Sequence, residues 1–187
     1  MLSKLSPAIG RLLISEPFLA DPNFARSVVL IAEETEEGVL GVVLNQKSNL
    51  LLNDLVPGIV GLDFSIFIGG PVEVDSIFYL HRCYDKIPSG FEITKGLYWS
   101  YDFDLVHQLV EDKNLNANEI RFFLGYSGWS SPQLKEEIEQ NTWIVSDQYE
   151  ADIVFSESDE EVWSEVIKNL GPKYAHIVNF PQNPNLN

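Results

Sequence analysis

The order of the apolar patterns along the chain limits the fold to a few classes. Short runs of β-branched and aromatic residues dominate the first hundred residues, and the longer patterns with helical spacing come mostly after them. The two kinds of pattern do not alternate regularly, as they would in a doubly wound fold with a parallel sheet. The order therefore predicts an α+β fold whose sheet is mixed and largely antiparallel.

Two of the β-rich runs indicate a hairpin. Ser27 to Ala32 and Val39 to Leu44 are joined by a short, glutamate-rich link that contains a glycine. The link lacks the alternating ligands of a calcium loop, so we interpret it as a solvated turn. Further strands are expected over 12–14, 65–68, 76–80, 89–94, 96–101, 120–124, 142–145 and 153–155, and helices over 51–56, from 102 or 104 onward, over 131–138 and over 159–170.

A glycine-rich segment follows the apolar run at 120–124, and we interpret it as a tight turn. Gly125 and Gly128 break the run, and a helix is expected to begin with Ser131 as its N-cap. The hydroxyl of Ser127 and the indole of Trp129 would then lie beside a helix N-terminus. Unpaired backbone N–H groups at such a terminus favour an anion or a polar ligand.

Length and cysteine content predict one cytoplasmic domain over residues 1–187, with an irregular Pro- and Asn-rich tail over 180–187. Nearly half of the residues are apolar, which is enough for a sizeable core. The single cysteine, Cys83, excludes an intramolecular disulfide and a multi-cysteine zinc site. We find no leader pattern and no run long enough to span a bilayer, so we expect no membrane association.

The charge balance argues against direct nucleic-acid binding. Twelve basic and 28 acidic residues give a net charge of −16, which repels polyanions, and no Arg- or Lys-rich recognition helix is visible. The three histidines show no paired ligand spacing, so we expect no metal. The segment at Gly69 and Gly70 resembles a phosphate-binding loop, but it lacks the Lys-Ser/Thr pair of a P-loop and the third glycine of a dinucleotide-binding motif. We therefore expect no cofactor either.

Several segments, in order along nearly the whole chain, form a recognisable set: 10–15, 21–29, 41–45, 69–72, 96–97 with Ser100, 123–129 with 133–134, and Asn141 with Trp143. Together they resemble the AlgH/YqgE family of bacterial proteins. The resemblance implies sheets folded into a partly closed barrel flanked by helices. The family is described as uncharacterised or, by association, as transcriptional regulators. The resemblance therefore provides no catalytic residues.

The polar residues at loops and strand ends suggest a small binding site. Arg26 closes a long loop in a chain poor in cations, so we expect its charge to be paired or presented to an anion. The candidate ligand-binding residues are Arg26, Asn45, Gly69, Gly70, Ser127 and Trp129. In the alternative interpretation, Arg26 pairs with Asp21 and the other residues satisfy turns and caps.

The function predicted from these residues is that of a non-catalytic binding or regulatory protein with a small anionic or polar ligand or a protein partner. The alternative is a hydrolase-like enzyme with Ser127 as nucleophile and His81 as base. The glycine spacing of a nucleophile elbow is not met, because Trp129 occupies the position of its second glycine. Direct sequence-specific DNA binding is a third interpretation, which the net charge opposes. Trp99, Trp143 and Trp163 are expected in the core or at an interface.

Overall fold

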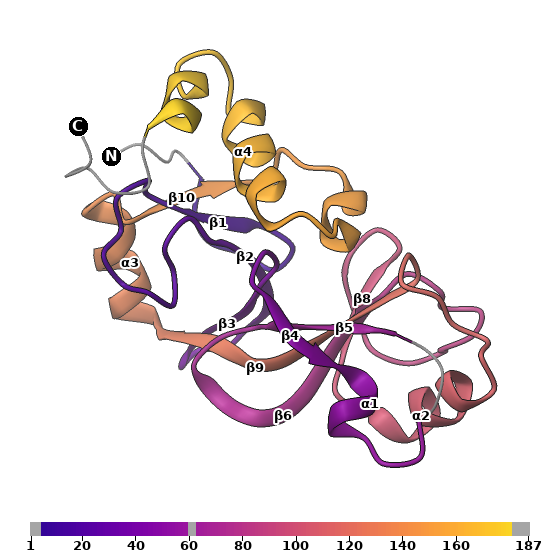
Figure 1. Ribbon diagram of the computed structural model, residues 1–187. Coiled ribbons are helices and arrows are strands. Elements are labelled where there is room, and N and C mark those ends of the chain that lie inside the picture. Colours follow the sequence, from indigo (N-terminus) through magenta and orange to yellow (C-terminus); the bar gives the residue numbers. More distant parts are fainter. Residues whose placement is uncertain (1–4, 60–62, 181–187) are drawn as a thin grey trace.

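The computed structural model describes residues 5–59 and 63–180 (Figure 1). Its strands are β1 (Leu12–Ser15), β2 (Val28–Glu34), β3 (Gly38–Val43), β4 (Lys47–Leu51), β5 (Ser65–Ile68), β6 (Val72–His81), β7 (Phe91–Thr94), β8 (Leu97–Ser100), β9 (Ile120–Ser130) and β10 (Trp143–Ser146). Its helices are α1 (Leu52–Leu55), α2 (Phe103–Glu111), α3 (Ser131–Glu139) and α4 (Asp159–Asn169), with 3-10 helices η1 (Ala151–Phe155) and η2 (Ala175–Asn179). None of the helices within these ranges is both long and apolar enough to cross a bilayer.

The strands form one mixed sheet in which β9 is the central element. The strand order is β10-β1-β2-β3-β9-β6-β8-β7. Outside this order, β5 pairs with β4 and with β9. The pairing of β5 with β9 is the only parallel pairing in the described part of the chain. The first half of β9 pairs with β5 and β6, and its second half pairs with β3. The prediction of an α+β fold with a largely antiparallel sheet is thus confirmed. The two end strands, β10 and β7, do not pair with each other in this order, so the partly closed barrel stays a prediction.

The sheet of β1, β2 and β3 is covered on both faces, which explains why these strands are apolar at successive positions except at their ends. Alternate residues point to opposite faces of a strand. Leu12, Ile14 and Leu30 pack with the α4 side chains, whereas Leu13 and Val29 pack with the α3 side chains. Figure 1 shows α4 and α3 on opposite sides of these strands.

A second core fills the other end of the molecule. There, α1 and α2 cover the end of the sheet where β5 and the first half of β9 lie (Figure 1). An aspartate at position 102 or 104 is expected to cap the helix that begins there, and the structure shows that it is Asp102, whose side chain accepts a hydrogen bond from the Asp104 backbone N–H. The hairpin of β2 and β3 and the pair of β7 and β8 are also confirmed.

The predicted tight turn over residues 125–129 is wrong, because β9 runs through it without a break to Ser130. Gly125 has φ +66°, a left-handed conformation that glycine adopts easily and that lets the strand continue past a local distortion. The helix that follows is capped by Ser130 rather than Ser131, since the Ser130 hydroxyl accepts from the Gln133 N–H. Ser127 and Trp129 therefore belong to a strand and not to a helix terminus.

Two further expectations differ from the structure. Residues 153–155 were expected as a strand and lie in the 3-10 helix η1, because three apolar residues are too few to fix a period. The strand β4 was not expected, since its side chains are largely polar and exposed. The predicted irregular tail lies outside the described residues except for Phe180.

Candidate functional site

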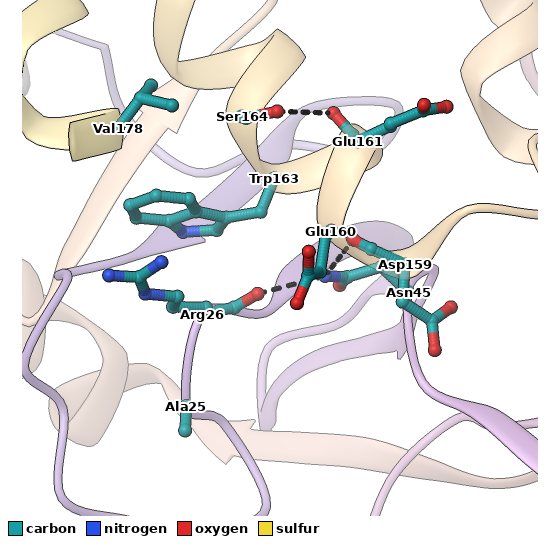
Figure 2. Close-up of a pocket in the computed structure, with 9 residues that line it drawn as sticks. All are labelled: Ala25, Arg26, Asn45, Asp159, Glu160, Glu161, Trp163, Ser164 and Val178. Carbon is teal, nitrogen blue, oxygen red and sulfur yellow. Dashed lines mark hydrogen bonds between the residues drawn. The ribbon is translucent and has the colours of Figure 1, made fainter. Parts of the chain in front are cut away.

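The Arg26 cavity lies where the loop between β1 and β2 meets the end of β3 and the start of α4. Its volume is about 440 Å³, and the residues that line it include Arg26, Asn45, Asp159, Glu160, Trp163 and Val178. Figure 2 shows the Arg26 guanidinium opposite the indole ring of Trp163. The structure thus brings two of the predicted site residues, Arg26 and Asn45, to one cavity.

Among the described residues, neutral groups and not a carboxylate hold Arg26 in place. Its guanidinium carbon lies 4.9 Å from the centre of the Trp163 ring, a cation–π contact, and its Nη2 donates to the Phe180 carbonyl oxygen. In residues 5–59 and 63–180 no acidic side chain forms an ion pair with Arg26, and its buried Nε has no hydrogen-bond partner. The alternative pairing of Arg26 with Asp21 is therefore not formed.

The backbone at Arg26 is unusual for a residue with a side chain, because its φ is +50°. Asn45 stabilises this turn. Its Nδ2 donates to the Arg26 carbonyl oxygen at 2.9 Å and to the Asp159 carbonyl oxygen at 3.1 Å, and its Oδ1 accepts from the Val28 N–H at 2.8 Å. All the hydrogen-bonding groups of the Asn45 amide except one lone pair are thus occupied, so Asn45 positions the cavity wall and has little capacity left for a ligand.

Acidic residues of α4 also line the Arg26 cavity. Asp159, Glu160 and Glu161 occupy the first turn of α4, where they interact favourably with the helix dipole. Asp159 Oδ2 accepts from the Lys47 N–H at 2.9 Å, while its buried Oδ1 has no partner among the described residues. The residues that line the cavity therefore include both a cation and carboxylates.

Gly69, Gly70 and Ser127 come together, but away from this cavity. The link between β5 and β6 crosses β9 so closely that a Cβ on Gly69 would lie 2.2 Å from the Gly125 carbonyl oxygen, and one on Gly70 would lie 2.3 Å from Ser127 Oγ. Ser127 is fully buried, and its hydroxyl donates to the Gly69 carbonyl oxygen at 3.0 Å. These three residues therefore form a packed chain crossing.

Trp129 lies in a different place again. It lines a second cavity, here called the Glu137 cavity, of about 380 Å³, together with Asp21, Phe24, Gln133, Glu137 and Trp143 among others. The loop over residues 17–26 contributes to both cavities, since its Phe24 lines one and its Arg26 the other. The six predicted ligand-binding residues thus divide among three places.

The structure does not join Ser127 to His81. His81 pairs with Ile120 at the start of β9, whereas Ser127 lies in the second half of β9 and pairs with Gly41 of β3. His81 Nε2 lies 2.9 Å from the Ser89 carbonyl oxygen and therefore serves as a donor, and burial lowers the His81 pKa. The pair therefore lacks the contact that a nucleophile and its base require.

Two other chemistries find no support in the described residues. Burial raises the pKa of the Cys83 thiol to about 11, so this group is protonated and unreactive at neutral pH. Across the described ranges, no three His, Cys, Asp or Glu side chains gather in a group that could hold a metal ion.

Several cavity residues could not be identified from the sequence as site residues. Asp159 and Glu160 appear there only as the acidic first turn of a helix, and Trp163 only as a core aromatic. Each reaches the Arg26 cavity because α4 packs across β1, more than a hundred residues away in sequence. The only local signal was the arginine that closes a long loop in an acidic chain.

The fold and its cavities define a mixed α+β protein with polar cavities on both sides of one loop. A model of the family described as AlgH-like matches residues 12–175. A UPF0301 protein of Bacteroides fragilis is 42% identical over 186 residues, which cover 99% of this chain and 94% of the relative. A UPF0301 protein of Bacteroides thetaiotaomicron is 41% identical over 182 residues, covering 97% and 92%. The chain belongs to the AlgH-like family.

Solved structures agree with this assignment. The solution structure of the AlgH protein from Pseudomonas aeruginosa has a TM-score of 0.73 and 28% identity, and the match covers 96% of this chain and 98% of that one. A crystal structure of a protein from Corynebacterium diphtheriae has a TM-score of 0.78, with 94% of each chain covered; at 24% identity it supports the fold alone. The sequence resemblance to the AlgH/YqgE family is thereby confirmed.

Proposed function

We propose that this chain is a non-catalytic binding protein that takes a small polar ligand in the Arg26 cavity. The observation that carries the proposal is the Arg26 guanidinium, which lies against Trp163 at the cavity wall without a carboxylate partner among the described residues. A cation without an ion-pair partner among the described residues can bind an anionic group of a ligand. The volume of about 440 Å³ falls in the range of small-molecule sites.

The charges around the cavity define the ligand further. A simple anion would meet Arg26 but would be repelled by the carboxylates of Asp159 and Glu160, which also line the cavity. A ligand that carries both a carboxylate and an ammonium or amide N–H satisfies both kinds of charge. We therefore expect a small zwitterionic or mixed polar compound, such as an amino acid or a short peptide.

A regulatory role follows from such binding without contact to DNA. Arg26 Nη2 donates to the carbonyl oxygen of Phe180, so a ligand at Arg26 would change the contacts of Phe180, the residue that caps η2. Val178 of η2 also lines the cavity, so η2 is the part of the wall through which binding could be passed to a protein partner. Regulation of transcription, if the protein has that role, would then be indirect, in keeping with the net charge of −16.

The test is thermal unfolding in the presence of defined probes. We expect α-amino acids at roughly 10 mM to raise the melting temperature more than succinate or inorganic phosphate does. Arg26→Gln should abolish that rise, whereas Arg11→Gln should keep it, because Arg11 bonds the exposed Ser6 carbonyl oxygen and does not line the cavity. An absence of any rise, or an equal rise in Arg26→Gln, would overturn the proposal.

A further inference from the structure

Phe180 already makes two contacts that a ligand of the Arg26 cavity could make. Its carbonyl oxygen accepts a hydrogen bond from Arg26 Nη2, and its ring stacks on that of Phe18, with the ring centroids 5.5 Å apart and the planes inclined by 11°. The Phe180 backbone is extended at this point, with φ −68° and ψ 138°. An extended phenylalanyl residue of the chain itself therefore occupies the cation of the cavity.

The segment that carries Phe180 is weakly attached. No residue of η2 is buried, and its larger apolar side chains, Ile177 and Val178, are half-buried. Ile177 lines a cavity of about 240 Å³ and Val178 lines the Arg26 cavity, so the packing beneath the segment is incomplete. The backbone N–H groups of Ile177 and Phe180 donate within the segment, to the carbonyl oxygens of Tyr174 and Ile177. A segment with few buried contacts opens at a low free-energy cost.

A carboxylate would bind Arg26 better than the Phe180 carbonyl does. The carbonyl accepts from Nη2. The Nε–H group lies on the same edge of the guanidinium, and Nε is buried without a hydrogen-bond partner among the described residues. A carboxylate can accept from both groups of one edge at once, and such charge-assisted hydrogen bonds are about twice as strong as neutral ones. The contact with Phe180 therefore leaves a donor unused that a carboxylate would satisfy.

The Phe18 ring offers a second point of recognition. Its side chain is 40% exposed even with the Phe180 ring stacked on it, so a ligand ring could take the place of the Phe180 ring when that residue leaves. Stacked aromatic pairs are favourable beyond the area that they bury. The carboxylates of Asp159 and Glu160, which also line the cavity, would attract an ammonium group. An aromatic α-amino acid carries all three groups: a carboxylate, a ring and an ammonium.

We propose that Phe180 is an internal ligand of Arg26 and that the Arg26 cavity takes a free aromatic amino acid, which displaces it. The proposal rests on the function proposed above and adds the class of the ligand and the segment that the ligand releases. The two occupants exclude each other, so the apparent affinity for the free amino acid is reduced by the fraction of molecules in which Phe180 is bound. Weakening the Phe180 contact should therefore strengthen ligand binding.

Calorimetric titration of the full chain with three compounds tests the class of ligand. We expect L-phenylalanine to bind at least about tenfold more tightly than L-alanine, which lacks the ring, and than 2-phenylethylamine, which lacks the carboxylate. Equal affinity for the two amino acids would overturn this proposal and leave the function proposed above standing. An absence of binding by either amino acid would overturn both.

Variants of the two stacked rings test the competition. Phe180→Ala removes the competing ring and should bind L-phenylalanine about threefold or more tightly, whereas Phe18→Leu should lose the preference for L-phenylalanine over L-alanine. Phe91→Leu is the matched control, because Phe91 is an exposed phenylalanine of β7 that does not line the cavity, and it should change neither affinity. Unchanged or weaker binding in Phe180→Ala would show that Phe180 is not a competitor.

Amide hydrogen exchange tests the displacement directly. Saturating L-phenylalanine should speed exchange of the Ile177 and Phe180 N–H groups, because their segment is released, and should leave that of Val166 within α4 unchanged. Exchange at Ile177 and Phe180 that is unchanged or slower with the bound amino acid would overturn the proposal.

Discussion

The Ser127 hydroxyl donates a 3.0 Å hydrogen bond to the Gly69 carbonyl oxygen. The same carbonyl also accepts from the Val43 N–H at 2.9 Å. Ser127→Ala would therefore leave the acceptor with one donor, and we expect it to lower the free energy of unfolding by only about 0.5–1.5 kcal/mol. Urea unfolding measures this, with the exposed Ser6→Ala as a control that should change nothing. A loss of well over 3 kcal/mol would show that Ser127 has contacts beyond this bond.

The close approach at Gly70 has a larger expected effect. A Cβ there would lie 2.3 Å from Ser127 Oγ and from the Tyr126 carbonyl, so the backbone must move. We expect Gly70→Ala to cost about 1–3 kcal/mol or more through this overlap. Gly96→Ala is the matched control, because Gly96 has φ +76° but a Cβ built there would have no neighbouring atom within 4 Å. We expect this variant to lower the free energy of unfolding by about 1–2 kcal/mol from backbone strain alone. Equal melting temperatures of the two variants would show that the overlap relaxes without cost.

The fold class could be predicted because it depends on local patterns that the sequence displays. The apolar runs of β2 and β3 and the aspartate cap of α2 are such patterns, and the structure contains all of them. The continuation of β9 could not be predicted, since Gly125 and Gly128 ordinarily end a strand. A glycine is required at position 125 because the segment from Gly70 to Val72 approaches its backbone too closely for a side chain, and this contact comes from a distant part of the sequence.

The candidate site was predictable only in part, for a related reason. Arg26 and Asn45 lie at adjacent strand ends, so their meeting follows from the hairpin of β2 and β3. The acidic wall contributed by Asp159 depends on how a distant helix packs, which no local pattern encodes. In the same way, the meeting of Glu137 with two tryptophans requires α3 to fold back between β9 and β10.

Arg121 should be among the most sensitive positions of the sheet. Its side chain is 3% exposed, lies 3.8 Å over the Phe67 ring, and donates to the carbonyl oxygens of Leu44 at 3.2 Å and Ser156 at 2.5 Å. Burial lowers its pKa to about 10, which still leaves it charged at neutral pH. Hydrogen bonds to charged groups contribute about 1.5–3 kcal/mol each, so Arg121→Met should lower the free energy of unfolding by more than about 2 kcal/mol.

The matched control for Arg121 is Arg82→Met. Arg82 is an exposed arginine that pairs with the exposed Asp152, and such surface pairs contribute about 0–1 kcal/mol. Guanidinium chloride unfolding of both variants measures the difference. If Arg121→Met were no more destabilising than Arg82→Met, the buried hydrogen bonds of Arg121 would contribute nothing net.

His81 predicts a pH dependence of stability. It is fully buried, its Nδ1 has no partner among the described residues, and burial lowers its pKa from 6.5. Between the lowered folded pKa and the unfolded value near 6.5, the unfolded chain binds more protons, so stability falls as the pH falls through this window. The slope from one proton is at most about 1.4 kcal/mol per pH unit. His81→Gln keeps an N–H donor for the Ser89 carbonyl oxygen but does not titrate. We therefore expect urea unfolding to show that the free energies of unfolding of the unaltered chain and this variant differ most above pH 6.5, and that the difference narrows below this pH. A difference that does not depend on pH would mean that His81 keeps its ordinary pKa.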